Sequence, residues 1–173
     1  MRILITILTF TIICSQSSGQ SNQAGFIDSS VNKIKLRTPG SVENVFGRGK
    51  NYVDQVDDET DVITSDGKQL LTMVFHPGGT SNDFYEFRVA YNTKDIRPEL
   101  RISSNQFLTG KNISLGLTKR QVKKILGRPA RIKTENGVTI WTFETSNKDD
   151  RYFGRHDFKD GKLIQFWFGE EYP

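Results

Sequence analysis

The most constraining feature of this sequence is a short segment that specifies both ends of a helix. Thr118 and Gln121 have the Thr-x-x-Gln spacing of a capping box, in which each side chain satisfies a backbone N–H group in the first turn. Gly127 and Pro129 are typical of the end of a helix. Between these ends, apolar residues recur on one helical face: Val122, Ile125 and Leu126. The sequence therefore predicts a short helix that must bury this face against another element.

A fainter copy of the same pattern lies upstream, in residues 38–48. Thr38 stands at the N-cap position, Pro39 follows at the first helical position, and Gly47 ends the segment. The apolar face of this copy repeats that of the later one: Val42, Val45 and Phe46. Two copies of one unit favour a tandem-repeat scaffold.

A hairpin signal follows each predicted helix. The dipeptides Asp66-Gly67 and Asn136-Gly137 supply the backbone angles of tight turns and lie between apolar runs. Pairing outward from these turns places one apolar triplet on a common face in each copy: Val62, Leu71 and Met73 in the first, and Ile132, Trp141 and Phe143 in the second. A second hairpin is expected from residues 83–91 and 99–103 in the first copy, and from residues 151–159 and 162–168 in the second.

The sequence therefore predicts an α+β protein of two tandem repeats, each a short helix followed by a four-stranded antiparallel meander. A flexible segment at 20–33 would precede the first repeat, at 34–103. A linker at 104–112 would then lead to the second repeat, at 113–173.

Residues 1–19 have the layout of a secretory signal peptide, with a positive start, an apolar run and small residues before the expected cleavage after Gly19. The apolar run is too short to span a bilayer. Cys14 is the only cysteine of the chain. In a lipoprotein it would carry the lipid, whereas cleavage after Gly19 would remove it. We expect a periplasmic or extracellular protein, attached to the outer membrane only if Cys14 is lipidated.

The charge of the chain and its chemically versatile residues favour neither nucleic-acid binding nor catalysis. The formal net charge is only +4, and the densest basic cluster, at 119–124, spreads over the polar side of a predicted helix. His76 lies beside a turn sequence, and His156 and Asp157 are strand neighbours that should point to opposite faces. The acidic residues at 54–61 lack the order of a calcium-binding loop. We therefore expect no catalytic, cofactor or metal site and no nucleic-acid partner.

The last two predicted strands carry large apolar side chains on both faces. Strict alternation places Trp167 with Leu163 and Phe158, and places Phe166 opposite, on the side of Phe153. One face should pack on a helix, so the other either packs against the second repeat or binds a protein. The candidate interface consists of the strand aromatics Phe153, Phe158, Phe166 and Trp167, with Arg131, Lys133 and Arg155 as charges at its rim.

The segment from Leu115 to Pro129 resembles the SmpA/OmlA (BamE) family of small outer-membrane lipoproteins, through Gly116-Leu117-Thr118, Gln121-Val122 and Leu126-Gly127-Arg128-Pro129. Two such units look like the tandem arrangement of beta-lactamase inhibitory proteins, whose curved sheet grips an enzyme. The resemblance implies a non-catalytic protein that binds an envelope component or a secreted or periplasmic hydrolase through its sheet surface. The alternative is a lipoprotein anchored in the outer membrane, with a structural role in envelope assembly.

Overall fold

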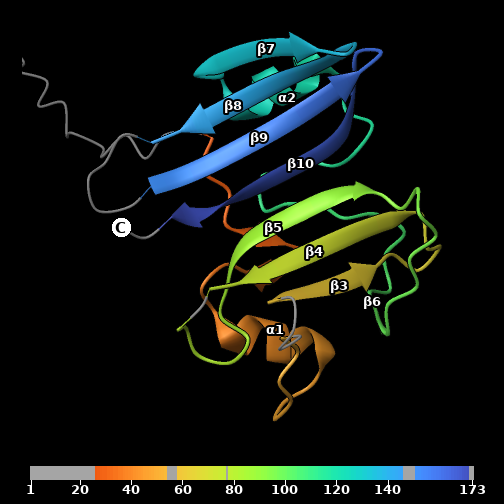
Figure 1. Ribbon diagram of the computed structural model, residues 1–173, viewed down its shortest axis with the longest axis vertical. Helices are drawn as coiled ribbons and strands as arrows, with labels where there is room; N and C mark the ends of the chain where they lie inside the picture. Colours follow the sequence, from red (N-terminus) through yellow and green to blue (C-terminus); the bar gives the residue numbers. More distant parts are fainter. Residues whose placement is uncertain (1–25, 54–57, 77, 146–150, 172–173) are drawn as a thin grey trace, which may run out of the picture.

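The computed structural model describes residues 26–53, 58–76, 78–145 and 151–171. The expected signal peptide and Cys14 lie outside these residues, as does part of the acidic segment. Within the described residues, eight strands form one mixed sheet in the order β6-β3-β4-β5-β10-β9-β8-β7 (Figure 1). These strands are β3 (Glu59–Ile63), β4 (Gln69–Phe75), β5 (Phe84–Tyr91), β6 (Leu100–Arg101), β7 (Arg131–Glu135), β8 (Val138–Glu144), β9 (Arg151–Lys159) and β10 (Lys162–Glu171).

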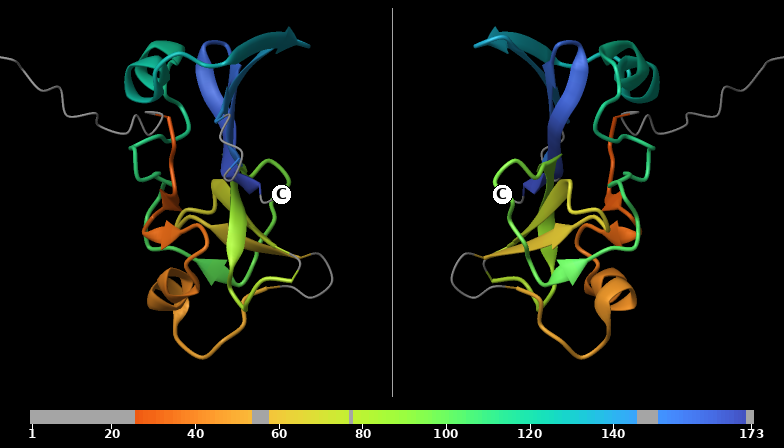
Figure 2. Two further views of the ribbon diagram at one scale, coloured as in Figure 1. Left: turned by 90° about the vertical axis from the view of Figure 1, so that its left-hand side faces the viewer. Right: turned by 90° about the vertical axis from the view of Figure 1, so that its right-hand side faces the viewer.

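The remaining elements lie on one side of this sheet. They are a small ribbon of β1 (Ser30–Val31) and β2 (Ile34–Lys35) and the helices α1 (Pro39–Phe46) and α2 (Lys119–Leu126). Figure 2 shows both helices and the ribbon on the same side of the strands. We call this side of the sheet the covered face. The other side, over which none of the described helices lies, is the open face.

The prediction of two repeats, each a helix followed by a four-stranded meander, is wrong. Strand β10 pairs along β5, so that both halves of the chain share a single sheet and the protein is mostly β. Strand β6 does not follow β5 in a meander but pairs in parallel with β3. Strand β5 pairs with β10 rather than with β6 because β10 offers it more apolar surface. Strand β10 brings Phe166 beside Val89 and Phe168 beside Phe87, whereas β6 is only two residues long.

The two helices differ in how well their local sequence specifies them. In α2 the capping box is present, since the backbone N–H of Thr118 donates to Gln121 Oε1 at 2.9 Å and Gln121 donates back to the Thr118 side chain. Thr38 occupies the N-cap position of α1, but its hydroxyl donates to the Leu36 carbonyl instead of accepting from the helix. The predicted cap of the first helix is therefore wrong, although Gly47 ends that helix as expected.

One apolar cluster on the covered face joins both halves of the chain. It includes side chains from the segment expected to be a linker, such as Phe107, which is fully buried, and Val31 from the segment expected to be flexible. These two segments contact each other through a β-bridge between Val31 and Thr109. Neither described helix is long and apolar enough to cross a membrane.

Candidate functional site: the open face of the sheet

Because strand partners point to the same side of a sheet, side chains on the open face form rows that cross the strands. Trp167 of β10 lies at the middle of one such row. It is directly opposite Arg88 of β5 on one side and Arg155 of β9 on the other. We call this the central row; its members across the sheet are Asp61, Thr72, Arg88, Trp167, Arg155, Thr142 and Arg131.

The guanidinium group of Arg155 packs on the face of the Trp167 indole ring. Its guanidinium carbon lies 4.4 Å from the centre of the indole ring, within the range of a cation–π interaction. The same guanidinium donates two hydrogen bonds to Asp157, at 2.8 and 3.0 Å. The hydrogen bond to Asp157 raises the pKa of Arg155. Gln165 donates to the same carboxylate at 2.7 Å. Asp157 is thus held from two strands, and it fixes the arginine that lies on the tryptophan.

Arg88 is paired in the same manner on the other side of Trp167. Its guanidinium contacts the carboxylate of Glu86 on its own strand and that of Glu59 on β3, the latter at 2.7 Å. Both arginines that flank the tryptophan are therefore held by carboxylates of the sheet itself. The site has nearly balanced charge, and its side chains are already ordered.

A second aromatic side chain of the open face lies diagonal to Trp167. Phe153 of β9 is directly opposite Gly169 of β10, one row away from the tryptophan. A Cβ atom at Gly169 would lie 2.8 Å from Cζ of Phe153 and 2.6 Å from the Tyr85 carbonyl oxygen. The phenyl ring therefore packs directly on the backbone of Gly169. Together, Trp167 and Phe153 form a half-buried aromatic patch on the open face.

The structure divides the predicted interface residues between the two faces. Phe158 and Phe166 lie on the covered face, and both are buried. Trp167 lies on the open face, opposite to the side of Leu163, so its predicted position is wrong. The cause is a β-bulge between Leu163 and Gln165, which shifts the alternation of β10 by one residue. For the same reason Phe153 shares the face of Trp167 rather than that of Phe166.

Like Arg155, the other two predicted rim charges lie on the open face. Arg131 and Lys133 belong to β7, the last strand of the sheet, and their side chains are exposed. Arg131 lies 3.8 Å from a carboxylate oxygen of Glu144, and Lys133 contacts Glu135. Such exposed ion pairs contribute little to stability, so both cations remain accessible to a partner.

Sequence reasoning missed Arg88, the arginine on the other side of Trp167. The alternation of residues 83–91 identified its strand correctly. Arg88 lies beside Trp167 because β5 pairs with β10, and this pairing joins residues far apart in the chain. No local pattern in the sequence encodes that pairing.

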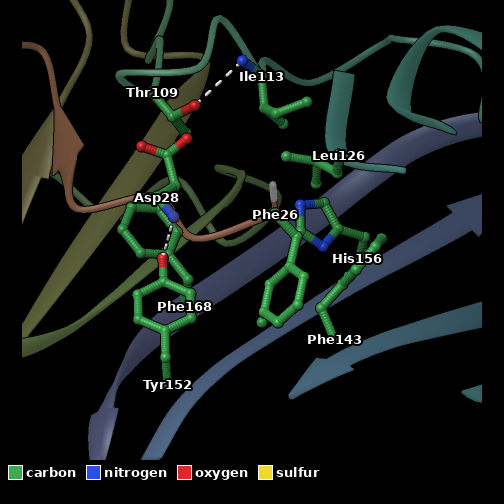
Figure 3. Close-up of a pocket in the computed structure, with 10 residues that line it drawn as sticks. Phe26, Asp28, Thr109, Ile113, Leu126, Phe143, Tyr152, His156 and Phe168 are labelled. Carbon is green, nitrogen blue, oxygen red and sulfur yellow. Dashed lines mark hydrogen bonds between the residues drawn. The ribbon is translucent and has the colours of Figure 1, made fainter. Parts of the chain in front are cut away.

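The covered face contains a buried histidine beside a small cavity (Figure 3). The His156 ring is stacked on Phe166, with 5.8 Å between the ring centres, and meets Phe143 edge-on. Its Nδ1 atom has no hydrogen-bond partner, and burial lowers its pKa to about 3. The cavity measures about 10 Å³, which is the lower limit for a single water molecule. It is too small for a substrate, so His156 is a core residue.

The comparisons with known proteins find little that is similar to this chain. No family model and no curated protein matches it. Among solved structures, it is similar to the crystal structure of a DUF4309 family protein (YjgB) from Bacillus subtilis, with 15% sequence identity and a TM-score of 0.45. The match covers 81% of this chain and 84% of that chain. This likeness is too low to assign a family or a function.

Proposed function

We propose that this protein is a non-catalytic protein-binding module that acts through the open face of its sheet, with Trp167 as the central anchor. The observation that carries the proposal is the placement of a half-buried tryptophan between two arginines in the middle of this face. Tryptophan and arginine are enriched among the residues that dominate binding energy at protein interfaces, and such residues cluster near the interface centre.

The arrangement of the central row supports this proposal because it is ordered before any partner arrives. The Arg155 guanidinium is held by Asp157, and the Arg88 guanidinium by Glu86 and Glu59. Binding a partner would therefore cost less conformational entropy than it would if these arginine side chains were free to move before binding.

The expected partner is an envelope component or a secreted or periplasmic hydrolase. This expectation depends on the export signal at residues 1–19 and on the resemblance to the SmpA/OmlA and beta-lactamase inhibitory proteins. Attachment to the outer membrane through Cys14 remains the alternative prediction, and labelling with a radioactive fatty acid would test it.

Affinity capture from envelope and culture-supernatant extracts, read by mass spectrometry, tests the protein-binding proposal. The Trp167→Ala variant should lose the proteins that the unchanged chain enriches. Val45→Ser is the matched control, because Val45 is a large apolar residue on α1, on the other side of the sheet, and is 36% exposed. Thermal unfolding must show that both variants are folded. Equal capture by the unchanged chain and Trp167→Ala would contradict the proposal.

A further inference from the structure

Strand β7 ends the sheet with an unpaired edge. Among the described strands it has β8 as its single neighbour, and all five of its residues are exposed. Ile132 is 61% exposed, more than any other large apolar side chain in the described residues. An unpaired strand with an exposed apolar residue is a template on which a further strand can add.

The turn after β7 determines which backbone groups face outward from this edge. Asn136 and Gly137 both have positive φ angles, +47° and +77°, as in a two-residue type I′ turn. Glu135 and Val138, which flank this turn, therefore form a hydrogen-bonded pair. Because hydrogen-bonded and open positions alternate along the strand, Ile132 and Thr134 direct their N–H and C=O groups away from the sheet.

We propose that β7 pairs with β7 of a second copy of this chain, antiparallel and centred on Thr134. The argument is charge complementarity, because β7 has its basic residues before Thr134 and its acidic residue after it. In this register each Lys133 lies opposite Glu135 of the second copy. The two Thr134 residues lie opposite each other, a favourable cross-strand pair.

Two neighbouring registers would place the same backbone groups opposite each other, and both are disfavoured. Centring the pairing on Lys133 would place Arg131 opposite Glu135 of the second copy, but it would also place the two Lys133 side chains directly opposite each other, where like charges are destabilising. Centring it on Ile132 would place Arg131 opposite Lys133, which brings four cations together. The register centred on Thr134 is therefore the one that the charges of β7 select.

This pairing would continue the sheet across two molecules. Antiparallel pairing of identical strands requires a two-fold axis perpendicular to the sheet, so the open faces of both copies lie on the same side. If the proposed function is correct, the dimer would present two Trp167 anchors to one partner surface. The pairing itself does not depend on that function, since β7 is at the edge and Trp167 at the centre of the sheet.

Sedimentation velocity of the purified chain over a series of concentrations tests the dimer. We expect the average mass to rise with concentration, and Thr134→Pro to abolish this rise. Proline removes the outward N–H group of Thr134 but no hydrogen bond to β8, and an edge strand tolerates it there. Thr134→Val is the matched control, since it retains the N–H group and should still associate. A constant monomer mass up to about 1 mM would overturn the proposal, as would association that Thr134→Pro leaves unchanged.

Charge reversal tests the register. Lys133→Glu and Glu135→Lys should each raise the dimer dissociation constant at least about tenfold, because each places like charges opposite each other twice. An equimolar mixture of the two variants should associate again, since every facing pair is then of opposite charge. Failure of the mixture to associate would overturn the register centred on Thr134. The Trp167→Ala variant should dimerise normally, which separates this result from the test of the binding face.

Discussion

The two faces of strands β9 and β10 place neighbouring residues of the chain in opposite environments. Phe166 is fully buried on the covered face, while Trp167, the next residue, is half-buried on the open face. His156 is enclosed by aromatic rings, while Arg155 beside it lies on a half-buried indole. Aromatic residues on one strand therefore have two roles: those on the covered face stabilise the fold, and those on the open face remain available for contact.

The two faces also differ in the environment that they give to titratable side chains. On the covered face, burial keeps His156 neutral. On the open face, charged side chains of opposite sign pair with each other, as Arg155 does with Asp157. This difference predicts that changes on the covered face alter stability and its pH dependence, whereas most changes on the open face alter binding.

The largest expected contrast is between Phe166→Ala and Trp167→Ala. Phe166 is fully buried, so its truncation should lower the free energy of unfolding by about 3–5 kcal/mol. Truncation of the half-buried Trp167 should lower the free energy of unfolding by less than about 2 kcal/mol. Urea denaturation of both variants measures the difference. Similar losses would mean that Trp167 is a core residue and that the two faces do not differ in the way described.

For two glycines the expected effect on stability is reversed: substitution on the open face should destabilise the protein more than substitution on the covered face. At Gly169, on the open face, an added Cβ would lie within 3.0 Å of two backbone atoms, so Gly169→Ala should cost about 1–3 kcal/mol. At Gly154, on the covered face, the nearest atom would be Cβ of Phe143 at 3.7 Å, an ordinary contact. Gly154→Ala should therefore change stability by less than about 0.5 kcal/mol. Thermal unfolding of the two variants checks this, and a larger loss for Gly154→Ala would contradict it.

The buried histidine should make stability depend on pH. Burial lowers the pKa of His156 to about 3, from an ordinary value of 6.5. Between these values the unfolded chain binds a proton that the folded chain does not, so protonation favours unfolding as the pH falls. The free energy of unfolding should therefore drop by about 2 kcal/mol from pH 7 to pH 5.

Urea denaturation at both pH values measures this dependence. His156→Phe is the control, since phenylalanine can stack on Phe166 and does not titrate in this range. The control should lose most of the pH dependence between pH 7 and 5. An equal slope in both proteins would show that His156 is not its source.

The smallest expected effect is the coupling between Arg155 and Trp167. A double-mutant cycle with Arg155→Ala and Trp167→Leu should give an interaction free energy of about 0.5–1 kcal/mol, as for an exposed cation–π pair. The cycle removes the separate cost of leaving the buried Asp157 without its arginine. A coupling near zero would mean that Arg155 is held by Asp157 alone.

The sequence alone determined the elements that local chemistry specifies. The capping box of α2 and the final glycines of both helices lie where predicted. The turns at Asn136-Gly137 and Asp160-Gly161 have the positive φ angles that type I′ geometry requires. The strand register that follows from the Asn136-Gly137 turn is also correct, as in the pairing of Ile132 with Trp141. Caps and two-residue turns depend on residues within a few positions of one another, so a single segment encodes them.

Only the tertiary structure decided how these elements combine. The pairing of β5 with β10 merged the expected repeats into one sheet, and it placed Arg88 beside Trp167. The bulge after Leu163 exchanged the faces of Phe166 and Trp167, and Phe107 of the expected linker became part of the core. Each of these outcomes depends on competition among distant segments for the same strand edge or the same buried surface. That competition is resolved by the total apolar area that the fold buries, which no short stretch of sequence contains.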